Sequence, residues 1–424
     1  MTRMEREKLR RILFKGDKII WIVFITLCAI SWVEVFSATS RQTYESGSYW
    51  GPIIKHTGFL IGGIALAWFI HTLKAKWIDK MTVAFYWLGL LGLVWAQMSG
   101  TKLNDSARWI TIPGIGMTIQ PMEIAKMGVI MLVARILAQY HTGKLQIDTK
   151  AIRLVNHLHS QLIALFKRRP KKAFINKNNV TLWKICAYTS APALIIFKEN
   201  FSSAGLLAVT VFFLMFIGGV PKKQLLKTIG IAVAGAALAW GIIAKAPEIL
   251  STFVGENKAM TWHNRIVGQK QESKEEEDKN AQTIYSHIAI ASSNIIGCGP
   301  GNSIQRDFIP HAYSDFIFAV IIEELGLLGA VAVLMMYLTL LYRSGKIAKK
   351  CDDPYPAFLA MGIGMIIVMQ ALLHMYISVG DLVTGQPLPL MSQGGTSVLI
   401  NSIYIGFLLS ISQYADNGNK KARA

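Results

Sequence analysis

Long apolar runs dominate this chain and limit it to one class of fold. Hydrophobic residues make up 52% of the 424 positions and charged residues only 16%. The runs approach the roughly 20 apolar residues with which a helix crosses a bilayer. They predict an all-α integral membrane protein of about ten transmembrane helices, with one membrane domain over residues 19–414. The predicted spans are 19–39, 55–73, 81–98, 120–139, 183–197, 203–219, 225–246, 315–342, 356–379 and 396–414.

Basic residues are concentrated in alternate loops, which sets the orientation. The first 18 residues, "MTRMEREKLRRILFKGDK", carry seven Lys or Arg and are predicted to be a cytoplasmic N-terminus. The same orientation places the basic 140–182 loop and the tail, 415–424, in the cytoplasm, so both termini lie there. The net charge of +19 is thus mainly a topology signal. It leaves little reason to expect nucleic-acid binding.

Two loops are long. The 140–182 loop could form an amphipathic helix on the membrane surface. A large extracytoplasmic loop, 248–314, joins helices 7 and 8 and combines the acidic "ESKEEEDK" with the Gly-rich "IIGCGPGNS". Long loops in compact proteins are usually functional or disordered, and glycines permit close backbone approach.

Asp315 is the first candidate for chemistry. It follows the polar "PHAYS" and precedes an apolar run, so it is expected at the outer mouth of the eighth span. Ionisable groups at membrane depth are costly and are functional candidates by default. One interpretation makes Asp315 a general base; the other makes Asp315, with Ser314, a cap of the helix N-terminus.

Glu323 and Glu324 follow in the same predicted helix. Helical geometry places Glu323 about 80° around and about 12 Å along from Asp315, with Glu324 on the opposite side. They are expected to have different partners. Pairing with basic groups on neighbouring spans is the favoured, structural interpretation.

The segments "NDSARWI" and "QPMEIAK" place further charges near the fourth span. Glu123 and Lys126 are three residues apart, which predicts an ion pair on one helix face. Arg108, upstream on the outer surface, could hold a phosphate in bidentate fashion or could simply snorkel beside Trp109.

The segment "TGQPLPLMSQGGTS" precedes the last span. Its two prolines exclude a regular helix, and irregular backbone at this depth is tolerated only where protein covers it or it lines a cavity. We therefore predict a re-entrant loop whose Ser392, Gly394 and Gly395 offer donors to a substrate. With Asp315 and the cations, this set suits a lipid-linked anionic substrate at the outer leaflet.

These motifs together resemble those of the SEDS family (shape, elongation, division and sporulation). The resemblance rests on "GNSIQRDFIPHAYSDFIFAVIIEELGLLG", "NDSARWI", "QPMEIAK" and "TGQPLPLMSQGGTS", and it covers nearly the whole membrane domain. "FSATS" and "TWHNRI" are more similar to the FtsW branch, which acts in cell division, than to the RodA branch, which acts in elongation.

The resemblance implies a peptidoglycan glycosyltransferase of the bacterial cytoplasmic (inner) membrane, with the division septum as its site of action. It would polymerise lipid II together with a class B penicillin-binding protein and other divisome proteins. Asp315 would be the catalytic residue, and Arg108, Lys126, Glu123, Ser392, Gly394 and Gly395 would bind substrate. Glu123 and Lys126 could instead pair with each other and hold the cavity open. No cofactor is certain; a divalent cation, magnesium or manganese, could bridge the pyrophosphate to Asp315.

The chain departs from the family pattern at several positions. His311 and Tyr313 replace a glutamate and a histidine, and His311 could tune Asp315. Asn200 stands at an acidic position, Gln393 replaces a tyrosine, and Leu382 replaces a proline. Glu34 is an additional acid in the first span.

Two other functions remain open from sequence alone. A flippase or transporter for the same lipid would use the same acid and cations. A non-catalytic scaffold for a penicillin-binding protein would not need Asp315 at all.

Overall fold

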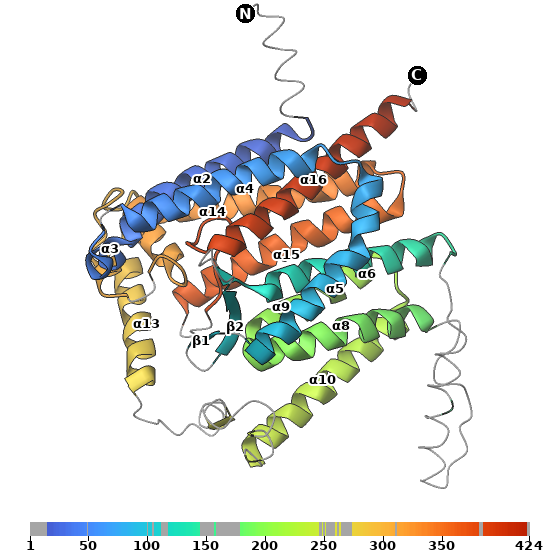
Figure 1. Cartoon of the computed structure of the whole chain (residues 1–424), viewed down its shortest axis with the longest axis horizontal. Helices are drawn as coiled ribbons and strands as arrows, with labels where there is room; N and C mark the ends of the chain where they lie inside the picture. The colour runs from blue at the N-terminus through green and yellow to red at the C-terminus, as the bar shows by residue number, and fades with distance from the viewer. Residues whose placement is uncertain are drawn as a thin grey trace, which may run out of the picture.

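The computed structural model shows an essentially helical molecule (Figure 1). The residues that it describes are 15–48, 50–99, 101–103, 106–111, 118–144, 179–245, 274–309, 312–380 and 385–421, with single positions at 157, 248, 251, 259, 260 and 263. Most of the predicted 140–182 loop and the first part of the predicted 248–314 loop lie outside these residues.

Each predicted span overlaps a helix in the structure. The helices are α2 (Lys18–Ala38), α4 (Gly51–His71), α5 (Ala75–Ser99), α6 (Pro121–His141), α8 (Val180–Glu199), α9 (Phe201–Ile217), α10 (Lys222–Lys245), α14 (Ile317–Lys350), α15 (Pro354–Val379) and α16 (Gly395–Lys421). Eight are long and apolar enough to cross a membrane. Of the other two, α9 is shorter, and α6 carries Glu123, Lys126 and Arg135. The total of ten crossings therefore stays a prediction.

Smaller elements lie beside the bundle. They are α3 (Ser40–Ser46), α13 (Lys274–Ser292), the 3₁₀ turn η1 (Gln305–Asp307), and the strands β1 (Thr101–Leu103), β2 (Ser106–Thr111) and β3 (Thr118–Ile119). The strands form an antiparallel sheet in the order β1-β2-β3. It follows α5 and leads into α6.

The centre of the bundle is formed by α6, α14, α15 and α16, whereas α10 lies at its edge (Figure 1). The apolar stretch of α16 is 83% buried and that of α10 only 6%. Where α5 crosses α6, a Cβ at Gly89 would lie 2.5 Å from the Ala125 Cα. Glycine at the crossing therefore lets the two backbones touch, as small residues do between membrane helices.

The two described ends of the chain meet on one side of the bundle. The Asp17 N–H donates to Ser412 Oγ at 2.9 Å, and the Asp17 carboxylate accepts from Arg343. These two interactions join the start of α2 to the C-terminal parts of α14 and α16. It agrees with the prediction that both termini share a side.

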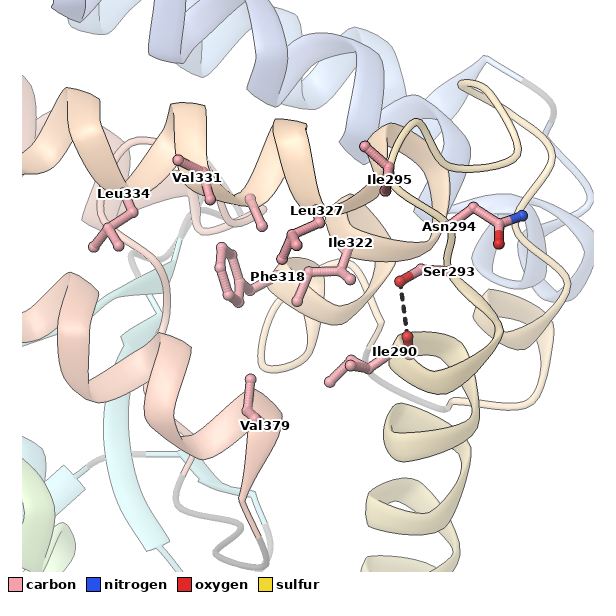
Figure 2. Close-up of a pocket in the computed structure, with 11 residues that line it drawn as sticks. Ile290, Ser293, Asn294, Ile295, Phe318, Ile322, Leu327, Val331, Leu334 and Val379 are labelled. Atoms are coloured by element: carbon pink, nitrogen blue, oxygen red, sulfur yellow. Dashed lines mark hydrogen bonds between the residues drawn. The ribbon is translucent and has the colours of Figure 1, made fainter.

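Helix α14 is broken at Gly326. A straight helix of its 34 residues would be about 51 Å long, well beyond a bilayer core. Gly326 has φ 71° and ψ −172°, and the chain changes direction there. Figure 2 shows Phe318 and Ile322, before the break, running back beside Leu327 and Val331, after it.

The predicted span 315–342 is therefore wrong at its start. Residues 317–325 form a short helix that folds back against the membrane helix 327–350. Periodicity could not reveal this, because both parts are apolar and the reversal depends on the backbone conformation of a single glycine.

Residues 294–299 fill the break in α14. The N–H groups of Leu327 and Leu328 donate to the carbonyls of Asn294 and Ile295 at 3.2 and 3.1 Å. A Cβ at Gly326 would lie 2.4 Å from the Gly297 nitrogen, so these glycines touch backbone to backbone. The backbone groups that the break releases are thus satisfied by a second segment of chain.

Glu323 binds the segment that follows. Its carboxylate accepts from the Ser303 hydroxyl and from the Ile304 N–H at 3.1 Å, and its backbone carbonyl accepts from the Cys298 N–H at 3.0 Å. Burial raises the pKa of the Cys298 thiol, and the charges of Glu323 and Glu324 raise it further. The thiol is therefore protonated at neutral pH.

Glu324 binds the same segment from the other side. It accepts from the N–H groups of Gly301 and Ser303 at 2.9 and 3.2 Å and from the Ser37 hydroxyl of α2. Arg306 Nη1 lies 3.5 Å from its carboxylate. The predicted pairing with a basic group is wrong for Glu323, whose donors are a hydroxyl and backbone N–H groups. Glu324 does have a basic partner, but Arg306 belongs to the outer segment and not to a neighbouring span.

We expect Gly326→Ala to destabilise the protein by about 2 kcal/mol or more, since the Cβ adds both a positive-φ cost and a backbone clash. The unfolding midpoint of the full-length protein in detergent measures this. Gly345→Ala is the matched control, because Gly345 lies in the same helix and its Cβ would meet only Met361 Sδ, at 3.8 Å. Equal midpoints for the two variants would contradict the proposed close contact.

Glu324→Leu is expected to cost about 3 kcal/mol or more, because it leaves two amide N–H groups and Arg306 without their acceptor. Asp416→Asn removes the exposed ion pair with Lys350 and should cost less than about 1 kcal/mol. Thermal unfolding and proteolysis of residues 293–309 report the effect. A Glu324→Leu protein as stable and as protease-resistant as Asp416→Asn would show that the carboxylate is dispensable.

Candidate active site

Asp315 lies in a turn, residues 312–316, that enters the bundle ahead of the short helix 317–325. Its side chain is half-buried, whereas Phe316 and Ile317 are fully buried. Phe316 is the N-cap of α14, and no side chain caps that end. The helix-capping interpretation of Asp315 is therefore not supported, and its carboxylate stays partly accessible. His311 lies outside the described residues.

A buried loop, residues 385–394, lies behind this turn. Ser31 of α2 donates to the Met391 carbonyl at 2.8 Å, and the Tyr337 hydroxyl donates to the Pro389 carbonyl. Leu390 adopts φ 66°, a conformation that is costly for a β-substituted residue. The expectation of irregular chain covered by protein is thus confirmed.

The 385–394 loop holds the two residues that directly precede Asp315. The Gln393 N–H donates to the Tyr313 carbonyl at 2.9 Å, and Ser392 Oγ donates to the Ser314 carbonyl at 2.7 Å. Ser392 Oγ also accepts from the Leu388 N–H at 2.7 Å. Because Ser392 is buried and its hydroxyl is engaged twice, the structure places it behind Asp315 rather than open to a substrate.

Gly394 and Gly395 lie where the loop becomes α16. The Gly394 carbonyl accepts from the Val398 N–H at 2.9 Å. A Cβ at Gly395 would lie 2.5 Å from the Phe59 ring. Close packing against α4 therefore accounts for Gly395, and its predicted contact with substrate stays a prediction.

Glu123 and Lys126 form the predicted ion pair at the start of α6, with 2.8 Å between Lys126 Nζ and Glu123 Oε1. Both side chains are fully buried. Lys126 Nζ also donates to Gln370 Oε1 of α15 at 3.0 Å. The geometry favours a pair that holds α6 and α15 together over one that touches a phosphate directly.

Arg108 lies on β2, in the small sheet beside α5 and α6. The structure does not describe its side chain. Its proximity to Asp315 and its contact with a pyrophosphate therefore remain predictions.

Two departures from the family pattern have structural outcomes. Asn200 is the N-cap of α9, and its Oδ1 accepts from the Ser203 N–H at 3.1 Å. The amide oxygen of Asn200 therefore caps α9 in the same way that the oxygen of an acidic side chain at this position could. Glu34 is fully buried, and within the described residues neither carboxylate oxygen has a hydrogen-bond partner; no contact explains it.

An apolar groove of about 610 Å³ begins one helical turn from Asp315 (Figure 2). Phe318 and Ile322 form one wall, Leu327, Val331 and Leu334 another, and Ile290 and Val379 close its end. Such a groove can accept an apolar chain. The sequence analysis missed it because it exists only where α14 folds back on itself.

The described residues contain no group of three or more His, Cys, Asp or Glu side chains that could hold a metal. They offer no dedicated site for a divalent cation. A divalent cation that bridges the pyrophosphate to Asp315 therefore stays a prediction, and Asp315 is the one protein ligand proposed for it.

Comparison with known proteins agrees with this architecture. The model of the cell cycle protein family FtsW, RodA and SpoVE matches residues 17–417. A probable peptidoglycan glycosyltransferase FtsW of Halomonas elongata is 28% identical over 402 residues, covering 92% of this chain and 89% of the relative. The protein of the same name from Coxiella burnetii is 26% identical over 411 residues, covering 94% and 96%.

Solved structures share the fold. A chain from a study of how a peptidoglycan synthase complex coordinates polymerization and crosslinking aligns with TM-score 0.65 and 20% identity, covering 94% of this chain and 98% of that one. The rod shape determining protein RodA of Thermus thermophilus aligns with TM-score 0.59 and 18% identity, covering 94% and 96%. At these identities the likeness establishes the fold, and the family match extends over nearly the whole sequence. The chain belongs to the FtsW, RodA and SpoVE family of cell cycle proteins.

Proposed function

We propose that the protein is a peptidoglycan glycosyltransferase that polymerises lipid II at the outer face of the bacterial cytoplasmic membrane. The observation that carries the proposal is the half-buried Asp315 carboxylate, on a turn whose two preceding residues are bonded to the buried 385–394 loop. The names of the relatives support the same activity.

Asp315 acts as the general base. It takes the proton from the acceptor sugar hydroxyl while that oxygen attacks the anomeric carbon of the donor. The new glycosidic bond forms as the bond to undecaprenyl pyrophosphate breaks, and the configuration at the anomeric carbon is inverted. Arg108 stabilises the leaving pyrophosphate, because a guanidinium binds phosphate oxygens in bidentate fashion.

The protein works with a crosslinking partner, a class B penicillin-binding protein. Support comes from the solved complex that couples polymerization to crosslinking and shares this fold. The FtsW names of the relatives favour a role in septal synthesis during division, with the other divisome proteins, over a role in elongation.

Asp315→Asn is expected to reduce glycan-strand synthesis from purified lipid II by about 100-fold or more, the usual contribution of a general base. The assay uses the full-length protein with and without a partner whose crosslinking site is inactivated. Asp307→Asn is the matched control and should stay within about two-fold of the wild type, because this side chain is 55% exposed and, among the described residues, pairs with Arg306 and accepts from Ser40 of α3.

Equal polymer from both variants would refute the role of Asp315. If the wild type made no polymer even with the partner, while the lipid still crossed vesicle membranes, a flippase would be the better account. An Asp315→Asn protein that fully supports its partner in cells would instead favour a scaffold.

A further inference from the structure

The buried Glu123–Lys126 pair is connected to the turn of Asp315 by a chain of hydrogen bonds. Lys126 Nζ donates to Gln370 Oε1 at 3.0 Å, and Gln370 Nε2 donates to the Pro387 carbonyl at 3.3 Å. Pro387 adjoins Leu388, whose N–H binds the Ser392 hydroxyl that holds Ser314. Within the part of the chain that the structure describes, Gln370 therefore connects α6 to the 385–394 loop.

The chemistry of the two neighbours fixes the amide of Gln370 in one orientation. An ammonium group only donates hydrogen bonds, and a backbone carbonyl only accepts them. The amide oxygen must therefore face Lys126, and the NH₂ group must face Pro387. Among side chains of this size, glutamine supplies both functions, whereas glutamate lacks the donor and methionine lacks both.

The surroundings keep this link rigid. Gln370 is 2% exposed, and Glu123 and Lys126 are fully buried. One turn further along α15, His374 Nδ1 lies 2.6 Å from the Gln386 carbonyl, so two neighbouring side chains of one helix face hold consecutive residues of the loop. Buried hydrogen bonds from neighbouring positions of one helix restrict the loop to one arrangement.

We propose that Gln370 is a positioning residue, which couples the Glu123–Lys126 pair to the 385–394 loop and thereby fixes the direction of the Asp315 carboxylate. This inference rests on the proposed glycosyltransferase function. It also gives Glu123 and Lys126 a structural role, which is to hold the 385–394 loop through Gln370. This role is compatible with their complete burial. Gln370 touches no substrate, so its effect is on the rate of the chemical step rather than on lipid binding.

The first test is the kinetics of Gln370→Met, which conserves volume but removes both hydrogen bonds. We expect kcat for lipid II polymerisation to fall about 10-fold to 100-fold, the range that a displacement near 1 Å can cause, with KM within about two-fold of the wild type. Gln413→Met is the control, because Gln413 makes a similar bond, to the His71 carbonyl at 2.8 Å, far from this chain of contacts. Unchanged kcat, or a rise in KM alone, would overturn the proposal.

The second test needs no activity and therefore separates this inference from the proposed function. Hydrogen exchange of the full-length protein should become about 10-fold faster or more at the amides of Leu388 and Gln393 in Gln370→Met. Gln370→Glu, which keeps the acceptor for Lys126 but loses the donor to Pro387, should show the same acceleration. Wild-type exchange rates in both variants would refute the coupling, whether or not the protein polymerises lipid II.

A double variant tests the shared path. Ser392→Ala interrupts the chain of contacts between Gln370 and Ser314. If both residues act through the same loop, Gln370→Met with Ser392→Ala should reduce kcat no more than about two-fold beyond the stronger single variant. Effects that multiply would show that the two residues act independently and would refute the proposed path.

Discussion

Backbone N–H and C=O groups inside a membrane protein must be paired, and this requirement organises the whole outer half of the bundle. Three irregular segments, residues 294–306, 312–316 and 385–394, lie among the helices. Unlike a helix, such a segment does not pair its own backbone N–H and C=O groups. Their backbone groups instead bond to side chains or to backbone groups of other segments, such as those left free at the break in α14. Ser31, Ser37, Tyr337, Gln370 and His374, polar residues of otherwise apolar spans, bond to these segments or to their partners.

The same pairing places a carboxylate accurately on a chain segment that has no regular structure. A general base must be held within a narrow range of distance and direction. Asp315 sits on a turn whose neighbouring carbonyls, those of Tyr313 and Ser314, are both bonded to the 385–394 loop. That loop is bonded in turn to α2, α14 and α15. Rigid helices thus determine the position of a residue that belongs to none of them.

The sequence predicted the features that depend on local spacing. Apolar run length located every helix of the bundle, and the i,i+3 separation predicted the Glu123–Lys126 pair. It failed where one residue decides the path of the chain, as Gly326 does. It also could not name the partners of Glu323 and Glu324, because these are backbone amides some 20 positions earlier. Gln370 gave only a weak signal, a single uncharged polar residue in an apolar helix.

The short helix 317–325 separates two environments that match the two parts of the proposed substrate. Phe318 and Ile322 face the apolar groove, whereas Glu323 and Glu324 face the paired polar segment. Lipid II has an apolar polyprenyl chain and a polar sugar-pyrophosphate head, so its reacting carbon must lie where these environments meet. Asp315 precedes this helix directly. A straight α14 would have separated Phe318 from Val331 and left no groove beside the carboxylate, so the reversal at Gly326 is as necessary to the site as Asp315 itself.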